Sequence, residues 1–342
     1  RGNERGPFEL HRLRALDAKV LEGYTGAYQI EPDRFAYIQP WDELGGDHPG
    51  WFDESGDVRS LYPVASDEFI AGPGAALPAP VEARVAFARG PQGEIDGLVR
   101  RVAAGAEAAW RPAQRVRLWS EEEVTFRNGD VNLAGTLLAP LPARRHPALV
   151  LLHGSGPQDR RGLLPFVHFL VRHGIALLGY DKRGVGGSTG DWRRSGFDDL
   201  ASDALAAVRF VKSRADTDPG KIGLFGVSQG GWIGPLAAAR SRDVAFVVSV
   251  SGPGTTPAEQ MLDHLENELR AEGVGDRGIA GALALARLTH DYARTGCGWE
   301  RIEAAVRESR DKEWFFPDMV PPKDHWSYGL WSLVFGYDPL PA

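Results

Sequence analysis

The chain has little cysteine, no long apolar run and no cluster of basic residues, and each shortage excludes a class of protein. Its 342 residues include one cysteine, Cys297, which excludes an intramolecular disulfide and a zinc site built on several cysteines. The formal net charge is -7 and the basic residues are scattered, so nucleic acid is not expected as the main partner. No apolar stretch approaches the roughly 20 residues of a membrane-spanning helix, so no membrane span is expected.

Neither the acidic stretch nor Cys297 indicates a metal-binding or reactive site, and the cellular compartment stays open. The acidic stretch Asp47 to Asp57 lacks the ligand spacing of a calcium-binding loop and is interpreted as a solvated loop. Cys297 lies between two glycines without a nearby histidine, and is interpreted as structural. The chain begins at Arg1, which is consistent with removal of a signal peptide or tag, so the compartment stays open between cytoplasmic and secreted.

The residues that are present form a distinct pattern around Ser228. A short apolar run leads into Gly226-Val227-Ser228-Gln229-Gly230, and a helical pattern follows it. A serine hydroxyl is a weak nucleophile, so an enzyme that uses one holds it at a sharp strand-to-helix turn where a base can reach it. The glycines on either side of Ser228 remove side chains that would clash in such a turn. Ser228 is therefore the predicted nucleophile.

The character of the sequence changes twice along the chain. Residues 1–20 carry a short amphipathic pattern that predicts a helical segment. Residues 21–115 consist of short, aromatic, alternating runs broken by Gly, Pro and Asp, which indicates a small antiparallel β domain. In residues 116–342, a hairpin with the turn Asn128-Gly129 is followed by continuous apolar strands alternating with helices. This alternation predicts an α/β domain with a mostly parallel sheet covered on both faces.

A helical cap is expected in the last part of this domain. Three amphipathic patterns, at 257–271, 279–293 and 299–310, follow the apolar strand 244–250 and precede an aromatic segment. Helices inserted after a strand of such a sheet lie over its carboxyl edge, where ligands bind. The cap is therefore placed at about residues 256–336.

A second glycine-rich turn supplies the expected partner of Ser228. Acyl transfer needs hydrogen-bond donors aimed at the oxyanion of the tetrahedral intermediate, and backbone N–H groups serve well. One donor comes from the residue after the nucleophile, Gln229. The turn His153-Gly154-Ser155-Gly156-Pro157 follows an apolar strand, as the second donor requires. Ser155 is assigned as that donor, with Gly156 as the next choice.

Three motifs, in this order, are similar to those of a known superfamily: His153 to Pro157, Tyr180-Asp181-Lys182-Arg183-Gly184-Val185-Gly186-Gly187-Ser188, and Gly226 to Gly230. Together they make residues 122–255 resemble the α/β-hydrolase superfamily, in particular its bacterial esterase and prolyl-oligopeptidase-like branches. The resemblance is specific for the fold and only weakly specific for the substrate. Residues 21–115 more loosely resemble the lipocalin-like β domain that accompanies some hydrolases.

The resemblance also implies roles for three residues beside the nucleophile. It places His153, Asp181 and Arg183 on loops near the mouth of the site. Asp181 and Arg183 are interpreted as holding their loop by ion pairing, and not as taking part in the chemistry.

The acid and base of the superfamily are not evident in this sequence. By the resemblance, an Asp or Glu and then a His follow the serine, on loops after two further strands. Only one more strand, 244–250, is expected after Ser228. We therefore expect the C-terminal strands, with the catalytic Asp and His, to lie outside this sequence, in a longer polypeptide or on a second chain. Within it, His325, beside Asp324, is the remaining candidate base.

The sequence-based hypothesis is a serine hydrolase that cleaves a small carboxylic ester through an acyl-enzyme on Ser228. This chemistry requires no metal or organic cofactor. The aromatic cap favours a mostly apolar acyl or alcohol group. A peptidase or amidase on the same machinery is one alternative. A non-catalytic binding module is another, because a fold alone does not establish activity. The oligomeric state stays unknown.

Overall fold

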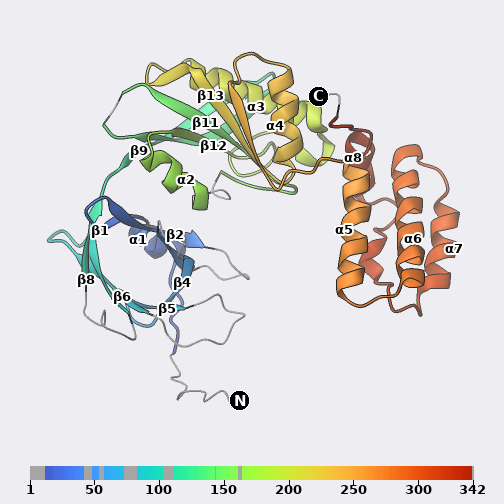
Figure 1. The fold of residues 1–342 in the computed structure, drawn as a ribbon, viewed down its shortest axis with the longest axis horizontal. Coiled ribbons are helices and arrows are strands. Elements are labelled where there is room, and N and C mark those ends of the chain that lie inside the picture. Colours follow the sequence, from blue (N-terminus) through green and yellow to red (C-terminus); the bar gives the residue numbers. More distant parts are fainter. Residues whose placement is uncertain are drawn as a thin grey trace. The chain divides into compact units, whose positions relative to one another are not determined.

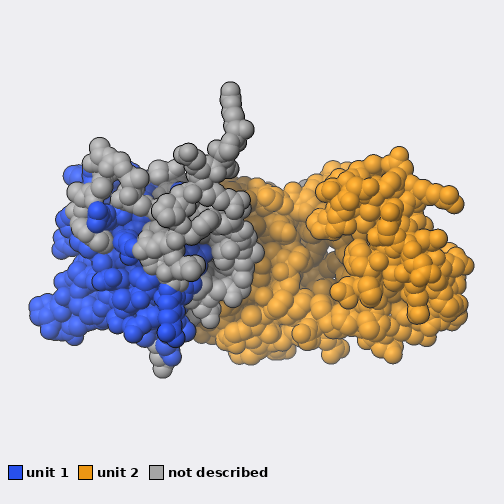
Figure 2. Space-filling view, turned by 90° about the horizontal axis from the view of Figure 1, so that it is seen from below, with its two compact units in different colours: residues 1–120, 140–142, 164–173 blue, residues 121–139, 143–163, 174–342 orange. Residues whose placement is uncertain are grey.

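The fold comes from a computed structural model that describes residues 12–41, 48–53, 58–72, 83–102, 111–142, 144–160 and 164–340. The chain divides into two compact units, which Figures 1 and 2 show. Unit 1 comprises residues 1–120, 140–142 and 164–173, and unit 2 comprises residues 121–139, 143–163 and 174–342. Each unit contains a hydrophobic core of its own.

Unit 1 is built on a closed barrel in which each strand pairs antiparallel with its neighbours and β1 pairs with β8 (Figure 1). The strands are β1 (Gly26–Glu31), β2 (Arg34–Trp41), β3 (His48–Asp53), β4 (Val58–Pro63), β5 (Glu68–Gly72), β6 (Ala83–Arg89), β7 (Ile95–Val102) and β8 (Arg111–Val116). Alternate side chains point inward and fill the barrel with large apolar groups, among them Tyr28, Trp51, Leu61 and Phe69. The antiparallel β domain predicted from the alternating runs is confirmed.

The N-terminal part of unit 1 differs from the prediction of a helix over residues 1–20. Residues 12–17 have no regular structure, and α1 (Ala18–Tyr24) begins only after them; residues 1–11 lie outside the described residues. The Arg14 N–H donates to the Pro63 carbonyl at 2.9 Å. Arg14 is therefore bonded to the barrel, and helical hydrogen bonds begin only with the Asp17 carbonyl, which accepts from Val20 and Leu21.

The acidic stretch from Asp47 to Asp57 also differs from its prediction as a loop. Its residues 48–53 form strand β3, which pairs antiparallel with β2 and β4. The rest of the stretch lies outside the described residues. The prediction went wrong because Trp51 and Phe52, which are buried, supply the apolar content of a strand within an acidic stretch.

Unit 2 is built on a six-stranded mixed sheet in the order β14-β13-β11-β12-β10-β9. Its strands are β9 (Trp119–Asn128), β10 (Val131–Pro140), β11 (His146–Leu152), β12 (Ala176–Tyr180), β13 (Thr217–Val227) and β14 (Phe246–Val250). The strands β12, β11, β13 and β14 run parallel, whereas β10 joins β12 antiparallel. The predicted α/β fold is confirmed.

Two helices of unit 2 pack on this sheet. In unit 2, α3 (Phe197–Lys212) and α4 (Gly230–Ala239) pack against each other and against β11 and β13. The helix α2 (Leu164–Arg172) groups with unit 1, where the His168 ring stacks on Trp119. The edge strand β14 has exposed Phe246 and Val248 side chains. That further strands of the sheet lie outside this sequence stays a prediction.

Three helices are present close to the bounds expected for the cap, and their placement over the site stays a prediction. They are α5 (Pro257–Ala271), α6 (Asp276–Thr295) and α7 (Trp299–Ser309), which lie side by side in that order (Figure 1). A capping box between Thr256 and Glu259 begins α5, and Gly296, with a φ of 69°, ends α6. After the short 3-10 helix η2 (Pro317–Met319), α8 (Trp326–Val334) packs into the core of unit 2 through Tyr328 and Val334. Among the described residues, no helix is long and apolar enough to cross a membrane.

Candidate active site

Ser228 lies at a tight turn between β13 and α4. Its φ is 52°, in the left-handed region that residues other than glycine rarely adopt. Two backbone hydrogen bonds hold the turn: the Ser228 N–H donates to Val250 O at 3.0 Å, and the Gly231 N–H donates to Ser228 O at 2.8 Å. The serine itself is exposed. This geometry is typical of a nucleophile elbow.

The glycines around Ser228 are required because the backbone passes very close to itself. A Cβ on Gly226 would lie 2.2 Å from Gly230 O, and one on Gly231 would lie 2.3 Å from the Gly252 Cα. Both distances are shorter than any real contact, so a side chain at either position would force the turn open.

The turn after β11 reaches the same level of the sheet as the elbow. Leu152, the last residue of β11, pairs with Gly226 of the parallel strand β13. A Cβ added to Gly154 would lie 3.7 Å from Val227 O, so the two turns pass close to each other. Among the described residues, none accepts a hydrogen bond from the N–H of Ser155, Gly156 or Gln229. The assignment of Ser155, Gly156 and Gln229 as oxyanion donors stays a prediction.

His153, predicted near the mouth of the site, is buried. Its Nε2 lies 2.5 Å from Tyr180 O, and its ring meets the Tyr180 ring edge to face. Burial, with a smaller effect from the Lys182 charge, lowers the pKa of His153 to about 4. The imidazole is therefore neutral near pH 7 and anchors the loop.

Asp181 is also buried, and it is enclosed by hydrogen bonds. Arg160 donates to its carboxylate through Nε at 3.0 Å and Nη2 at 2.8 Å, and the Gly187 N–H donates at 2.8 Å. Burial alone would raise the pKa of Asp181, but these donors lower it below its ordinary value. A Cβ on Gly186, whose φ is 53°, would lie 2.4 Å from the carboxylate. The glycine-rich turn thus wraps tightly around Asp181.

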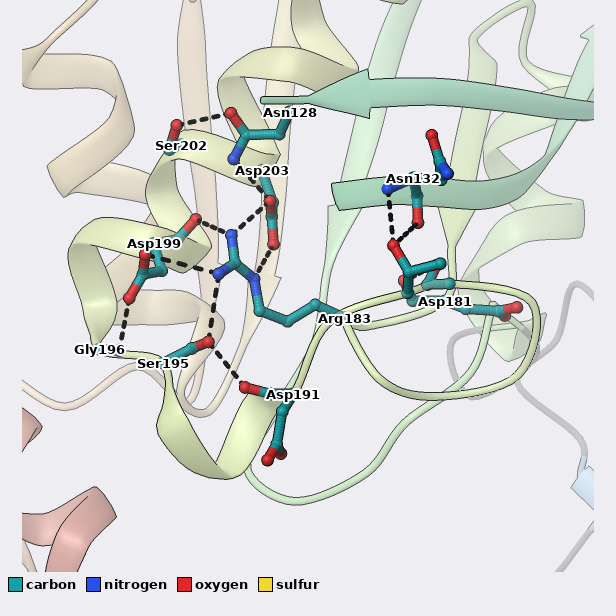
Figure 3. Close-up of polar contacts among 12 residues, drawn as sticks. Asn128, Asn132, Asp181, Arg183, Asp191, Ser195, Gly196, Asp199, Ser202 and Asp203 are labelled. Atoms are coloured by element: carbon teal, nitrogen blue, oxygen red, sulfur yellow. Dashed lines mark hydrogen bonds and ion pairs between the residues drawn. The ribbon is translucent and has the colours of Figure 1, made fainter. Parts of the chain in front are cut away.

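Arg183 forms a second buried ion pair on the other side of this turn. Figure 3 shows its guanidinium directed at Asp203 of α3, to which Nε donates at 2.7 Å and Nη2 at 2.8 Å. Nη1 also donates to Ser195 Oγ at 3.2 Å, and Asn128 Nδ2 donates to Asp203 at 2.7 Å. His153, Asp181 and Arg183 are each less than a tenth exposed. They anchor loops behind the surface and do not line a mouth.

Lys182, between these two anchors, was missed by the sequence analysis. It is 3% exposed, and its Nζ donates to Gly154 O at 2.6 Å, Gly156 O at 2.9 Å and Gln229 Oε1 at 3.0 Å. The available signal was its place directly after the apolar strand 176–180, where a surface lysine is not expected. Burial lowers the pKa of Lys182 to about 8.

The histidines after Ser228 are engaged elsewhere. His325, the remaining candidate base, caps α8: its Nδ1 lies 2.8 Å from Ser327 Oγ and accepts from the Ser327 N–H. His264 lies 3.1 Å from Glu268, and His290 packs against Phe335. Among the residues that the structure describes, no histidine is hydrogen-bonded to Ser228.

Other parts of the molecule do not compete with this site. A cleft of about 730 Å³ lies in unit 1, lined by Arg12, Leu13, Arg14, Ala15, Leu16, Val20, Tyr24, Val64, Ser66 and Arg89. It contains none of the predicted catalytic residues. Within the described ranges, no group of three or more His, Cys, Asp or Glu side chains could hold a metal ion.

The ion pair between Arg183 and Asp203 predicts a large effect on stability. Replacing Asp203, which is 1% exposed, by alanine leaves the buried guanidinium with only the half-exposed carboxylate of Asp199, whose Oδ1 lies 3.4 Å from Arg183 Nη1. We expect Asp203→Ala to lower the free energy of unfolding by about 3–5 kcal/mol. Arg270→Ala, which removes two exposed ion pairs, with Glu266 and Asp276, is the control and should cause a much smaller change. Urea unfolding followed by circular dichroism measures both; similar losses would contradict the prediction.

The buried His153 predicts a pH dependence of stability. Its folded pKa of about 4 lies below its ordinary value of 6.5, so the unfolded chain binds an extra proton between these values. Stability is therefore lost as the pH falls from 6.5 toward 4, at about 1.4 kcal/mol per pH unit for one such group. We expect His153→Gln to show a smaller slope between pH 5 and 6.5 in urea unfolding; identical slopes would show that this assignment is wrong.

Comparison with known proteins agrees with the geometry. The protein family described as serine aminopeptidase, S33, matches residues 143–292. The quorum-quenching protein AidA of Acinetobacter baumannii is 32% identical over 130 residues, which cover 37% of this chain and 42% of that protein. Esterase EstD of Thermotoga maritima is 27% identical over 190 residues, which cover 54% of this chain and 44% of that protein. The chain thus spans less than half the length of these relatives.

One of the similar solved structures is an α/β hydrolase that matches part of this chain. The α/β hydrolase GrgF from Penicillium sp. sh18 has a TM-score of 0.41 and 22% identity, covering 65% of this chain and 74% of that one. The range matched by the family, residues 143–292, contains the parallel strands β11, β12, β13 and β14 and the strand-to-helix turn at Ser228. The α/β part of this chain has the α/β-hydrolase fold, and its residues 143–292 match a family of that superfamily.

Proposed function

We propose that this protein is a serine hydrolase that cleaves carboxylic esters, with Ser228 as the nucleophile. The observation that carries the proposal is the exposed serine at a φ of 52°, in a turn beside N–H groups that no described residue engages. A strained backbone persists only where its surroundings hold it, and such strain is concentrated at functional sites. The name of EstD, an esterase, supports an ester as substrate.

The reaction follows from the positions of these groups. Ser228 Oγ attacks the ester carbonyl carbon as a base removes its proton, and the negative charge that develops on the carbonyl oxygen accepts from backbone N–H groups. Gln229 supplies one of these, and Ser155 or Gly156 supplies the other. The intermediate then expels the alcohol, which takes a proton, and leaves an acyl-enzyme. Water hydrolyses the acyl group and restores Ser228. The base is expected to be a histidine held by a carboxylate.

Aromatic groups near the loop support an apolar substrate group. Trp192 of η1 (Trp192–Arg194) and Trp326 of α8 meet edge to face, with ring centroids 5.2 Å apart. The Lys182 Nζ lies 6.0 Å from the Trp192 ring centroid, so this pair is close to the turn that carries Ser155. Trp326 is 42% exposed. Such a surface favours contact with an aliphatic or aromatic acyl or alcohol group.

The alternative activity is that of an amidase or peptidase. It is favoured by the description of the matched family as a serine aminopeptidase. The same elbow and N–H donors would serve, but the leaving group would be an amine. Rates on simple esters and on aminoacyl amides of the same acyl group separate the two activities, and we expect the ester to react faster.

The proposal predicts that Ser228 is the site of covalent modification. A fluorophosphonate should form one adduct on the full protein, located at Ser228 by peptide mass spectrometry. Ser228→Ala should abolish the adduct and lower ester hydrolysis by at least about 10⁴-fold. Ser251→Ala is the matched control, since Ser251 has the same φ of 52° but follows the neighbouring strand β14. It should keep both adduct and activity.

Two outcomes would contradict this prediction. An adduct retained in Ser228→Ala would place the nucleophile elsewhere. A wild-type protein that binds ester analogues, with an affinity unchanged by Ser228→Ala and without turnover, would instead be a binding module on this fold.

A further inference from the structure

We infer that Lys182 is a positioning residue whose ammonium group holds the two sides of the oxyanion hole in place. The inference rests on the proposed function, since it concerns the same N–H donors. It is carried by the three hydrogen bonds of Nζ, two to the turn after β11 and one to the residue that follows Ser228.

The bond to Gly154 O sets the direction of the Ser155 N–H. That carbonyl and that N–H belong to one peptide group, and in a trans peptide they point in opposite directions. Because Lys182 Nζ lies 2.6 Å from Gly154 O, the Ser155 N–H is turned away from the buried ammonium. The second bond, to Gly156 O at 2.9 Å, fixes the other end of the same short turn.

The bond to Gln229 connects this turn to the elbow. Gln229 contributes its backbone N–H to the oxyanion hole, and its side-chain Oε1 accepts from Lys182 Nζ at 3.0 Å. A protonated lysine has three N–H donors and no acceptor, and here each donor has an acceptor. Both sides of the oxyanion hole are thus tied to one group. A neutral amine would have one donor too few.

The surroundings of Lys182 explain why its position is rigid. The side chain is 3% exposed, and the cavity next to it has a volume of only about 10 Å³. Within the described residues Lys182 has no ion-pair partner, whereas Asp181 pairs with Arg160 and Arg183 pairs with Asp203. Bonds from a charged donor are roughly twice as strong as neutral ones. The cation also adds positive potential behind the N–H donors, where negative charge develops during the reaction.

The test compares Lys182→Met with Lys221→Met in the full protein. Methionine approximates the length of lysine but has no donors, and Lys221 is an exposed lysine at the surface of β13. We expect Lys182→Met to lower kcat for an ester by about 10²-fold, the scale of losing one oxyanion donor, with KM changed less than about threefold. Lys221→Met should behave as wild type. A rise in KM with kcat unchanged, or a loss no larger than that of Lys221→Met, would overturn the inference.

A second variant guards against poor folding of Lys182→Met. Gln229→Met keeps the backbone N–H and removes only the side-chain acceptor, so it should lower kcat in the same direction by a smaller factor. If both bonds act together, the double variant should lose less than the product of the single losses. A kcat of Gln229→Met equal to that of the wild type would overturn the proposed link between the two sides of the oxyanion hole.

The pH profile gives a readout that simple destabilisation would not move. Deprotonation of Lys182 removes one donor, so kcat of the wild type should fall above about pH 8, and this fall should be absent in Lys182→Met. His153, Tyr180 and Asp203 line the same cavity. Burial lowers the pKa of His153 to about 4 and raises that of Tyr180, and Asp203 is paired with Arg183. The same fall in both proteins would overturn the assignment.

A measurement without turnover separates failure of this inference from failure of the proposed function. Backbone NMR order parameters of Ser155 and Gln229 should fall in Lys182→Met and stay unchanged in Lys221→Met, even if Ser228 proves unreactive. Unchanged order parameters in Lys182→Met would overturn the positioning role, whatever the activity of the wild type.

Discussion

The site depends on the parallel pairing of β11 with β13. This pairing places Leu152 beside Gly226, so both strands end at one level of the sheet. The chain leaves β11 through the turn that carries Ser155, and it leaves β13 through the elbow that carries Ser228. Parallel strands present their carboxyl ends at the same edge, which is where such sheets bind ligands. Ser228 and the turn that carries Ser155, which are distant in sequence, therefore become neighbours through backbone pairing alone.

The segment from Asp181 to Arg183 then fixes the loops at this edge. Its three consecutive charged side chains are all buried, yet each has different partners: Arg160 for Asp181, Asp203 for Arg183, and loop oxygens for Lys182. Burying charge costs free energy unless the charge is paired and hydrogen-bonded. The two ion pairs meet this condition and serve as anchors. Lys182 has no counter-ion among the described residues, and its cost is offset only by the bonds that orient the turn.

Much of the fold was predictable because the hydrophobic periodicity of the sequence matches the side chains that are buried in the structure. The apolar strands of the sheet, the cap helices and the alternating strands of the barrel follow from periodicity, and the structure contains them. The prediction failed at residues 12–17, whose backbone bonds to Pro63, and at 48–53, where buried Trp51 and Phe52 form a strand within an acidic stretch. The bond to Pro63 comes from a distant part of the chain that a local pattern does not reveal, whereas Trp51 and Phe52 are a local signal that the surrounding acidic residues obscured.

The sequence by itself determined the elbow, because only glycine tolerates approaches as close as those at Gly226 and Gly231. It also located the second turn, since glycines after an apolar strand predict one wherever the strand pairs. Only the tertiary structure decided which charged residues are buried and what they bind. The sequence analysis interpreted Asp181 and Arg183 as ion-paired anchors, and the structure identifies their partners, adds His153 as an anchor and shows that Lys182 joins both turns. A side chain's role depends on what packs around it, and for Lys182 two of its three acceptors are backbone carbonyls, which every residue carries and no sequence motif marks.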